Sequence, residues 1–173
     1  MFTRELELWD RGLRLVAGLD EAGRGPLAGP VVASCVIFSP GVTPEGLADS
    51  KALSPRRREQ LAGVILQKSL AIGLGMASPA EIDRINILEA THLAMRRALS
   101  SLGLRPQIVL VDGLTASLGE VKQVAIVGGD AICASIAAAS IMAKVTRDSL
   151  MRSLAGLFPG YGFERNKGYG TRE

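Results

Sequence analysis

Apolar positions along the chain recur with two spacings, and these spacings predict its secondary structure. Between residues 13 and 19 apolar side chains alternate with other residues, which predicts a buried strand that leads directly into Asp20 and Glu21. Short apolar runs predict four further strands, at 31–38, 70–76, 107–111 and 121–127. We expect the first two strands to form an antiparallel, hairpin-like pair because they are close in sequence.

Helical patterns lie between these strands. Ser54 and Pro55 are residue types preferred at an N-cap and at the first helical position, so they predict a helix to about residue 68. A second helix is expected from 78–79 to about 102, with His92 on its apolar line and therefore packed against the core. A third helix, rich in alanine and serine, is expected over 131–148.

The order of these elements predicts one domain over 1–173, in which helices cover a sheet. The chain has 47% hydrophobic but only 4% aromatic residues, so its core must be aliphatic. Residues 161–173 are rich in glycine and carry interleaved aromatic and basic side chains, a composition suited to contact nucleic acid. An ordinary flexible tail is the alternative for this stretch.

Charge and cysteine content restrict the class of protein only loosely. A net charge of +3 is compatible with a polyanionic partner without requiring one. Cys35 and Cys133 lie among apolar or small residues and are expected to be buried free thiols. The start of the chain is charged, and no apolar run approaches the roughly 18 residues of a membrane span. We therefore expect a cytoplasmic protein.

Four acids stand at the predicted ends of elements: Asp20, Glu21, Asp112 and Asp130. Gathering carboxylates is unfavourable without cations, because two unit charges ~4 Å apart repel by about 4 kcal/mol at an effective dielectric constant of 20. Oxygen-only ligands favour Mg²⁺ or Mn²⁺, and two such ions suit phosphodiester hydrolysis. A histidine-based mechanism is excluded because the chain has one histidine.

Two features of the first acids affect this hypothesis. Adjacent residues of a regular strand point to opposite faces, so Asp20 and Glu21 can share a site only if the strand ends between them. The glycine-rich stretch Gly23-Arg24-Gly25 follows, and its backbone N–H groups can approach a ligand closely. The alternative interpretation is a plain turn with solvated acids. The glycine spacing does not match the known phosphate-binding loops.

Five stretches in order along the chain resemble one family. They read GLDEAGRGPLAGPVVAS, DSKALS, VDG, SIAAASIMAKVTRD and YGFERNKGYGT. Together they resemble the type 2 ribonuclease H family, the bacterial ribonuclease HII. The resemblance implies an α/β ribonuclease H-like fold with a mixed five-stranded sheet flanked by helices. It also implies a monomer that cuts the RNA strand of RNA/DNA hybrids, and cuts 5′ of single ribonucleotides in duplex DNA, leaving 3′-OH and 5′-phosphate ends.

The resemblance also implies residue roles. Two Mg²⁺ or Mn²⁺ ions would be bound by the four acids above. The Gly23-Arg24-Gly25 backbone would contact the ribose 2′-OH at the RNA-to-DNA junction, and Tyr169 would pack on the adjacent deoxyribose. Lys51 and Lys144 match family positions and are assigned a phosphate-binding or structural role.

Three departures from the family pattern bear on local contacts rather than on the acids. Leu114 stands where a polar residue is common, and Gly128 replaces the usual lysine before Gly-Asp. The chain ends at Glu173, where family members normally continue into a further helix. A hybrid-binding module with impaired catalysis is therefore one alternative function. A DNA resolvase of the same fold is another, although it would not need a 2′-OH reader.

Overall fold

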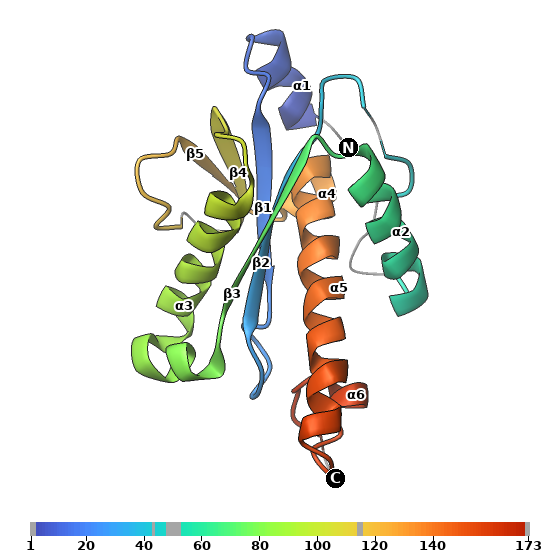
Figure 1. Cartoon of the computed structure of the whole chain (residues 1–173). Coiled ribbons are helices and arrows are strands. Elements are labelled where there is room, and N and C mark those ends of the chain that lie inside the picture. Colours follow the sequence, from blue (N-terminus) through green and yellow to red (C-terminus); the bar gives the residue numbers. More distant parts are fainter. Residues whose placement is uncertain (1–2, 43, 48–52, 114–115, 172–173) are drawn as a thin grey trace.

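The computed structural model describes residues 3–42, 44–47, 53–113 and 116–171, and its centre is a mixed five-stranded sheet (Figure 1). The strand order is β3-β2-β1-β4-β5, in which β2 pairs antiparallel with β1 and β3, whereas β1, β4 and β5 run parallel. The strands are β1 (Val16–Ala22), β2 (Val31–Ile37), β3 (Ala71–Ala77), β4 (Ile108–Asp112) and β5 (Gln123–Ile126). The predicted sheet is confirmed.

Helices cover both faces of this sheet. The helices are α1 (Thr3–Asp10), α2 (Pro55–Lys68), α3 (Pro79–Ser101), α4 (Gly129–Ile132), α5 (Ala134–Leu157) and α6 (Phe163–Asn166). Helix α3 lies on one face, and α5 lies on the other with α2 beside it (Figure 1). No helix in the described ranges is long and apolar enough to cross a membrane.

The helix starts follow the sequence closely. Ser54 caps α2 by accepting a hydrogen bond from the backbone N–H of Arg57 at 3.3 Å. Ser78 and Glu81 form a capping box at the start of α3, with each side chain accepting a bond from the other residue's backbone N–H. These two predicted starts are confirmed.

The third predicted helix differs from the structure in its continuity and its length. Cys133 has φ −113° and ψ 120°, an extended conformation that separates the short α4 from α5, and α5 then continues to Leu157 rather than ending near residue 148. The break turns the chain from the end of β5 onto the sheet face. Cys133 and Cys35 are both free and buried, as predicted.

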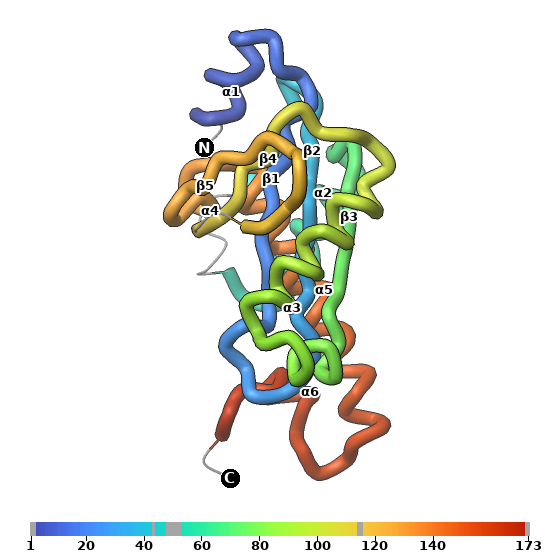
Figure 2. Tube along the Cα trace, turned by 90° about the vertical axis from the view of Figure 1, so that its left-hand side faces the viewer, coloured from blue at the N-terminus to red at the C-terminus, as the bar shows by residue number. Residues whose placement is uncertain are grey.

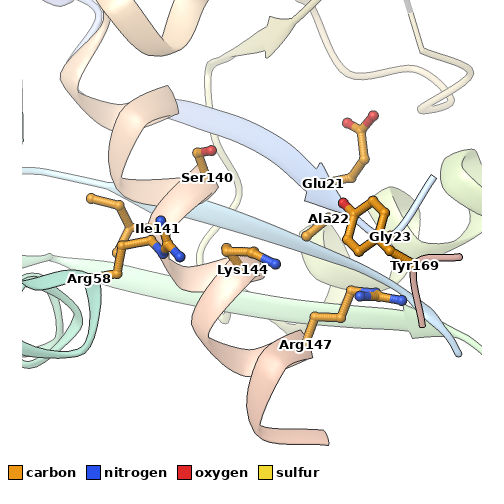
Figure 3. Close-up of a pocket in the computed structure, with 9 residues that line it drawn as sticks. All are labelled: Glu21, Ala22, Gly23, Arg58, Ser140, Ile141, Lys144, Arg147 and Tyr169. Carbon is orange, nitrogen blue, oxygen red and sulfur yellow. The ribbon is translucent and has the colours of Figure 1, made fainter. Parts of the chain in front are cut away.

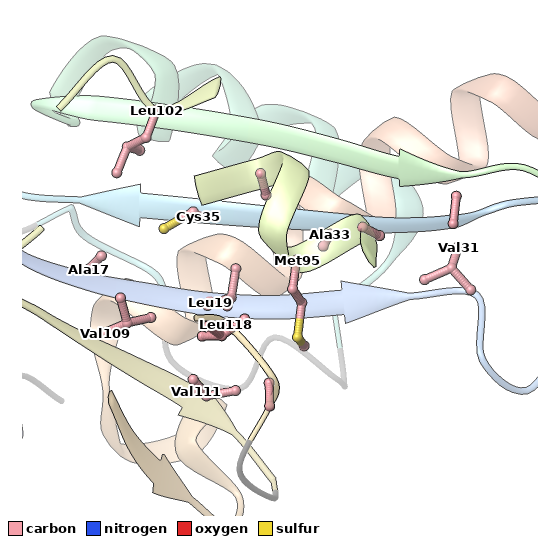
Figure 4. Packing of buried hydrophobic residues seen from close by; sticks show 14 of the residues in the cluster. Ala17, Leu19, Val31, Ala33, Cys35, Met95, Leu102, Val109, Val111 and Leu118 are labelled. Atoms are coloured by element: carbon pink, nitrogen blue, oxygen red, sulfur yellow. The ribbon is translucent and has the colours of Figure 1, made fainter. Parts of the chain in front are cut away.

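The buried strand predicted for the start of the chain is confirmed, although β1 begins at Val16 rather than near residue 13. Val16 through Asp20 are all buried, because α3 covers one face of this central strand and α5 the other. On the α3 side, aliphatic residues of three strands pack together (Figure 4); they include Ala17, Leu19, Ala33, Cys35, Val109 and Val111. On the other side Gly18 meets α5, and a Cβ at position 18 would lie 2.1 Å from the carbonyl carbon of Ser135.

The C-terminal segment lies against the loop that connects β1 to β2. Figure 2 shows the chain after α6 lying beside the loop between β1 and β2. Backbone N–H groups of Leu27 and Ala28 in that loop donate to the carbonyl oxygen of Gly168 at 2.9 and 3.2 Å. Segments far apart in sequence are thereby joined next to the end of β1.

Candidate active site

The register of β1 against β4 brings the first acids to one edge of the sheet. Gly18 pairs with Leu110 and Leu19 with Val111, so Asp20 and Asp112 come next on neighbouring strands. Leu110 packs with Cys133 and Ile136 on the α5 side of the sheet, and Asp20 and Asp112, two residues further on, face that same side. Topology alone therefore places these two carboxyl groups together.

Glu21 joins this edge by a different route from the one the sequence suggested. The strand does not end between Asp20 and Glu21, because β1 continues to Ala22. Its neighbour β4 ends at Asp112, however, and Glu21 extends beyond that end. The Glu21 carboxylate accepts a hydrogen bond from Arg24 at 3.1 Å, and its side chain is only 13% exposed.

The charge on Asp20 is unfavourable in this environment. Burial, which has the largest effect, together with the nearby carboxylates of Glu21 and Asp112 raises the pKa of the Asp20 carboxyl to about 8. Hydrogen bonds from the Ser140 side chain and from the backbone N–H of Glu21, the latter at 2.8 Å, lower the pKa and offset part of this effect.

Asp112 and Asp130 belong to the adjoining turn between sheet and helix. The Asp112 carboxylate accepts a hydrogen bond from the backbone N–H of Gly129 at 2.7 Å, which ties β4 to the start of α4. Asp130 follows in the first turn of α4 and is 4% exposed. Gly128, the residue before α4, has φ 66°. This is a left-handed conformation in which glycine is unstrained and a lysine is disfavoured.

The donor set suits a hard divalent cation, although the carboxylates are not arranged as a finished site. All candidate ligands are oxygen atoms, and a cation beside Asp20 would offset the repulsion that raises the pKa of that carboxyl. Within the described ranges, no group of three or more His, Cys, Asp or Glu side chains is placed to hold a metal ion. The four-acid ligand set therefore stays a prediction.

A cavity of about 310 Å³ lies beside these acids on the α5 side (Figure 3). It is lined by Glu21 and Gly23 from the start of the chain, by Ser140 and Lys144 from α5, and by Tyr169 from the tail. The structure thus brings together predicted residues that are more than a hundred positions apart in sequence. Its walls carry both a carboxylate and basic groups.

Tyr169 forms one end of this cavity and lies against the glycine-rich loop. A Cβ at position 25 would be 3.7 Å from the Tyr169 ring, so Gly25 and the ring are in near contact. The Lys144 ammonium lies 5.9 Å from the ring centroid and pairs with Asp148 at 2.7 Å. The ring is half exposed and can receive a ligand.

Arg147 holds the loop and the tail together, and the sequence analysis did not single it out. Its guanidinium donates to the carbonyl oxygens of Pro30 at 2.9 Å, Ala28 at 3.0 Å and Lys167 at 2.9 Å. The side chain is 1% exposed, and burial lowers the pKa of Arg147. The sequence around Arg147 carries other charged residues as well and gave no indication of this role. Lys51 and Leu114 lie outside the described residues.

Comparison with known proteins gives one consistent result. The Ribonuclease HII family profile matches residues 17–173. A Ribonuclease HII of Moorella thermoacetica is 54% identical over 173 residues, which cover all of this chain and 84% of the relative. One of Ligilactobacillus salivarius is 49% identical over 98% of this chain and 66% of its own length.

Solved structures agree with the fold. The ribonuclease H2 of Pyrococcus horikoshii OT3 superposes with a TM-score of 0.77 at 33% identity, covering 91% of this chain and 81% of that one. Bst-RNase HIII, solved in complex with Mn²⁺, superposes with a TM-score of 0.72 at 19% identity, covering 82% and 54%. The second likeness concerns the fold alone.

Proposed function

Because this chain belongs to the ribonuclease HII family, a family of nuclease hydrolases, we propose that it is a metal-dependent endoribonuclease acting on RNA/DNA duplexes. It cuts the RNA strand of hybrids, cuts 5′ of single ribonucleotides in duplex DNA, and leaves 3′-OH and 5′-phosphate ends. The observation that carries this proposal is the position of Asp20. This buried acid lies beside Glu21 and Asp112 and next to the cavity closed by Tyr169.

In this proposal the acids hold two Mg²⁺ or Mn²⁺ ions, with Asp20, Glu21, Asp112 and Asp130 as ligands. When bound, such ions activate a water molecule and stabilise the leaving 3′ oxygen. The chain itself contributes the burial that excludes bulk water from Asp20, and the Ser140 hydrogen bond that orients its carboxylate.

Substrate selection falls to the loop and the tail. Backbone groups of Gly23, Arg24 and Gly25 contact the ribose 2′-OH, which distinguishes RNA from DNA at one position. The Tyr169 ring packs on the deoxyribose of the next nucleotide. Lys144, in the wall of the same cavity, contacts a backbone phosphate, and Lys51 is proposed to do so as well.

A duplex with one embedded ribonucleotide, incubated with Mg²⁺ or Mn²⁺, tests this function. A nick 5′ of the ribonucleotide is the expected result. Tight binding without a nick would instead favour a hybrid-binding module, and cutting of all-DNA branched substrates would favour a resolvase. An all-DNA duplex of the same sequence serves as the control, because it lacks the 2′-OH and should stay intact.

A further inference from the structure

Helix α1 carries a buried acid that the proposed mechanism does not use. This acid is Glu5, which is only 1% exposed. Figure 1 shows α1 at the end of the sheet where α4 and α5 begin, and its Trp9 packs with Cys133 and Ile136 of that region. Because burying a carboxylate is costly unless polar groups contact it, the partners of Glu5 indicate what this position is for.

The hydrogen bonds that the structure describes for Glu5 all go to one residue of α5. Its Oε1 atom accepts from the backbone N–H of Ser135 at 2.8 Å and from the Ser135 hydroxyl at 2.7 Å, while Oε2 is buried without a partner among the described residues. Helix α5 has no cap of its own, because Cys133 at the N-cap makes no side-chain hydrogen bond and the first turn contains no acid. Glu5 therefore supplies the acceptor and the negative charge that a helix N-terminus favours.

Ser135 is also the residue at which α5 touches the central strand. A Cβ at position 18 would lie 2.1 Å from the carbonyl carbon of Ser135, so the strand and the helix are in backbone contact at Gly18. The same residue of α5 is thus bonded to α1 and packed on β1. The start of α5 is therefore held by two elements at one point.

This point of contact leads directly to the acids. Asp20 lies two residues beyond Gly18 along β1, roughly 7 Å away. Ser140 lies five residues beyond Ser135 along α5, about 7.5 Å away. The strand and the helix thus advance by similar lengths, and the Ser140 side chain hydrogen-bonds to the Asp20 carboxyl group. A shift of α5 at Ser135 would displace the Ser140 hydroxyl from its partner.

We propose that Glu5 is a positioning residue, which holds Ser135 on β1 and thereby keeps the Ser140 hydroxyl on the Asp20 carboxylate. Ser140 in turn orients an acid that the proposed function uses as a metal ligand, and the inference rests on that function. Glu5 acts through its acceptor oxygen and not through a contact with substrate. It should therefore affect turnover of the substrate and not its binding.

Three single variants test the hydrogen bonds of Glu5, at a temperature where circular dichroism shows each protein to be folded. Glu5→Met removes the acceptor at similar length. On a duplex with one ribonucleotide in Mg²⁺, its kcat should fall about tenfold while KM changes less than about twofold. Glu5→Gln keeps an acceptor oxygen and should recover most of the loss. Glu7→Met is the control, because Glu7 is 54% exposed on the same helix, and both constants should stay unchanged.

A double-mutant cycle with Ser140→Ala tests the path from Glu5 to Asp20. If Glu5 acts through Ser140, Glu5→Met should lower kcat less than about twofold in a Ser140→Ala background. An unchanged kcat in Glu5→Met, or a full tenfold loss in both backgrounds, would overturn the proposal. Ser135→Ala removes one of the two donors and should lower kcat about threefold, so it replaces Glu5→Met in the cycle if that variant does not fold.

Urea unfolding of the proteins in this cycle gives a test that does not depend on cleavage. No described hydrogen bond joins Glu5 to Ser140, so a merely local cap predicts that their effects on the unfolding equilibrium constant multiply within about twofold. The proposal predicts a combined effect at least about threefold smaller than that product, and a simple product would contradict it. If the unmodified protein nicks no duplex, the proposed function fails, whereas the unfolding comparison still decides the role of Glu5.

Discussion

The acids and the glycine-rich loop proposed to read the substrate lie side by side but are held in place differently. Asp20 and Asp112 take their positions from the register of two central strands packed between helices, so many apolar contacts fix them. The glycine-rich loop and the tail depend on one buried side chain, Arg147, and on a few backbone hydrogen bonds. The proposed catalytic half of the site, with Asp20 and Asp112, is therefore part of the core, and the proposed reading half, the loop and the tail, is attached to it.

The most severe disruption of the catalytic half is Asp20→Asn. It removes a negatively charged ligand at nearly constant volume, so nicking of every substrate should be lost. The fold and the loop should remain intact, because the strand register does not depend on this carboxylate. Single-turnover nicking assays measure the first effect and duplex binding the second. A near-normal rate would exclude the proposed role of Asp20.

Arg147→Met should be the largest perturbation of the reading half. It leaves the carbonyl oxygens of Pro30, Ala28 and Lys167 without their donor, at a cost of roughly 3 kcal/mol in the free energy of unfolding. Urea denaturation measures this cost, and limited proteolysis should show earlier cleavage of the tail.

Arg152→Met is the matched control for that experiment. Arg152 lies on the same helix and is 44% exposed, and its ion pair with Glu59 should be worth less than about 1 kcal/mol. If both variants lose the same stability, Arg147 is not the special attachment described above. Stabilisation by Mg²⁺ should persist in Arg147→Met, because the acids are positioned independently of it.

The acid cluster should also make stability depend on pH. The pKa of Asp20 is about 8 in the folded protein against an ordinary value of 3.8. Between these values the folded state holds the proton more tightly than the unfolded chain, so the free energy of unfolding should fall as pH rises, by up to about 6 kcal/mol. Thermal melts of metal-free protein at several pH values measure this.

Asp20→Asn should flatten this pH dependence, and Mg²⁺ should oppose it most at the alkaline end. Asp83→Asn, at an exposed acid, should leave the profile unchanged. A profile that rises with pH in the metal-free protein would contradict the assigned pKa direction. Tyr169 variants should not alter the dependence of stability on pH, because this dependence is assigned to Asp20 and not to the loop and the tail.

Tyr169→Ala should have the smallest effect and the most selective one. Loss of ring packing on a sugar should reduce nicking at single ribonucleotides about fivefold, near 1 kcal/mol, and reduce cutting of long hybrids less. Tyr161→Ala is the control, because Tyr161 stacks on Phe163 in the tail and does not line the cavity beside the acids. Equal losses on all substrates would contradict junction reading.

The sequence predicted the elements that position the acids better than the contacts that hold the loop and the tail. The five strands and the capped starts of α2 and α3 follow from local patterns, and the acids follow from strand ends. The bounds of β1 did not, because the apolar pattern begins at Leu13 whereas the strand itself begins at Val16. Cys133 gave no local signal for its extended conformation, which tertiary packing imposes.

Contacts between segments far apart in the sequence could not be predicted from sequence patterns either. Helix α1 is too short to be indicated by periodicity, and it is held by buried Glu5, which accepts hydrogen bonds from the backbone and side chain of Ser135. The three partners of Arg147 are backbone carbonyl oxygens, which every residue has, so the sequence does not indicate them. Such contacts become visible only when distant segments meet.

Gly18 sets the distance between α5 and β1, and the geometry around the Asp20 carboxylate depends on this distance. With hydrogen in place of a side chain, it lets α5 approach β1 until the two backbones are in contact, and this separation fixes the height of Ser140 above Asp20. Any larger residue at position 18 would lift the helix and widen the gap at the carboxylate. Adjusting the chemistry of this edge by redesign would thus require α5 and β1 to be changed together as a pair.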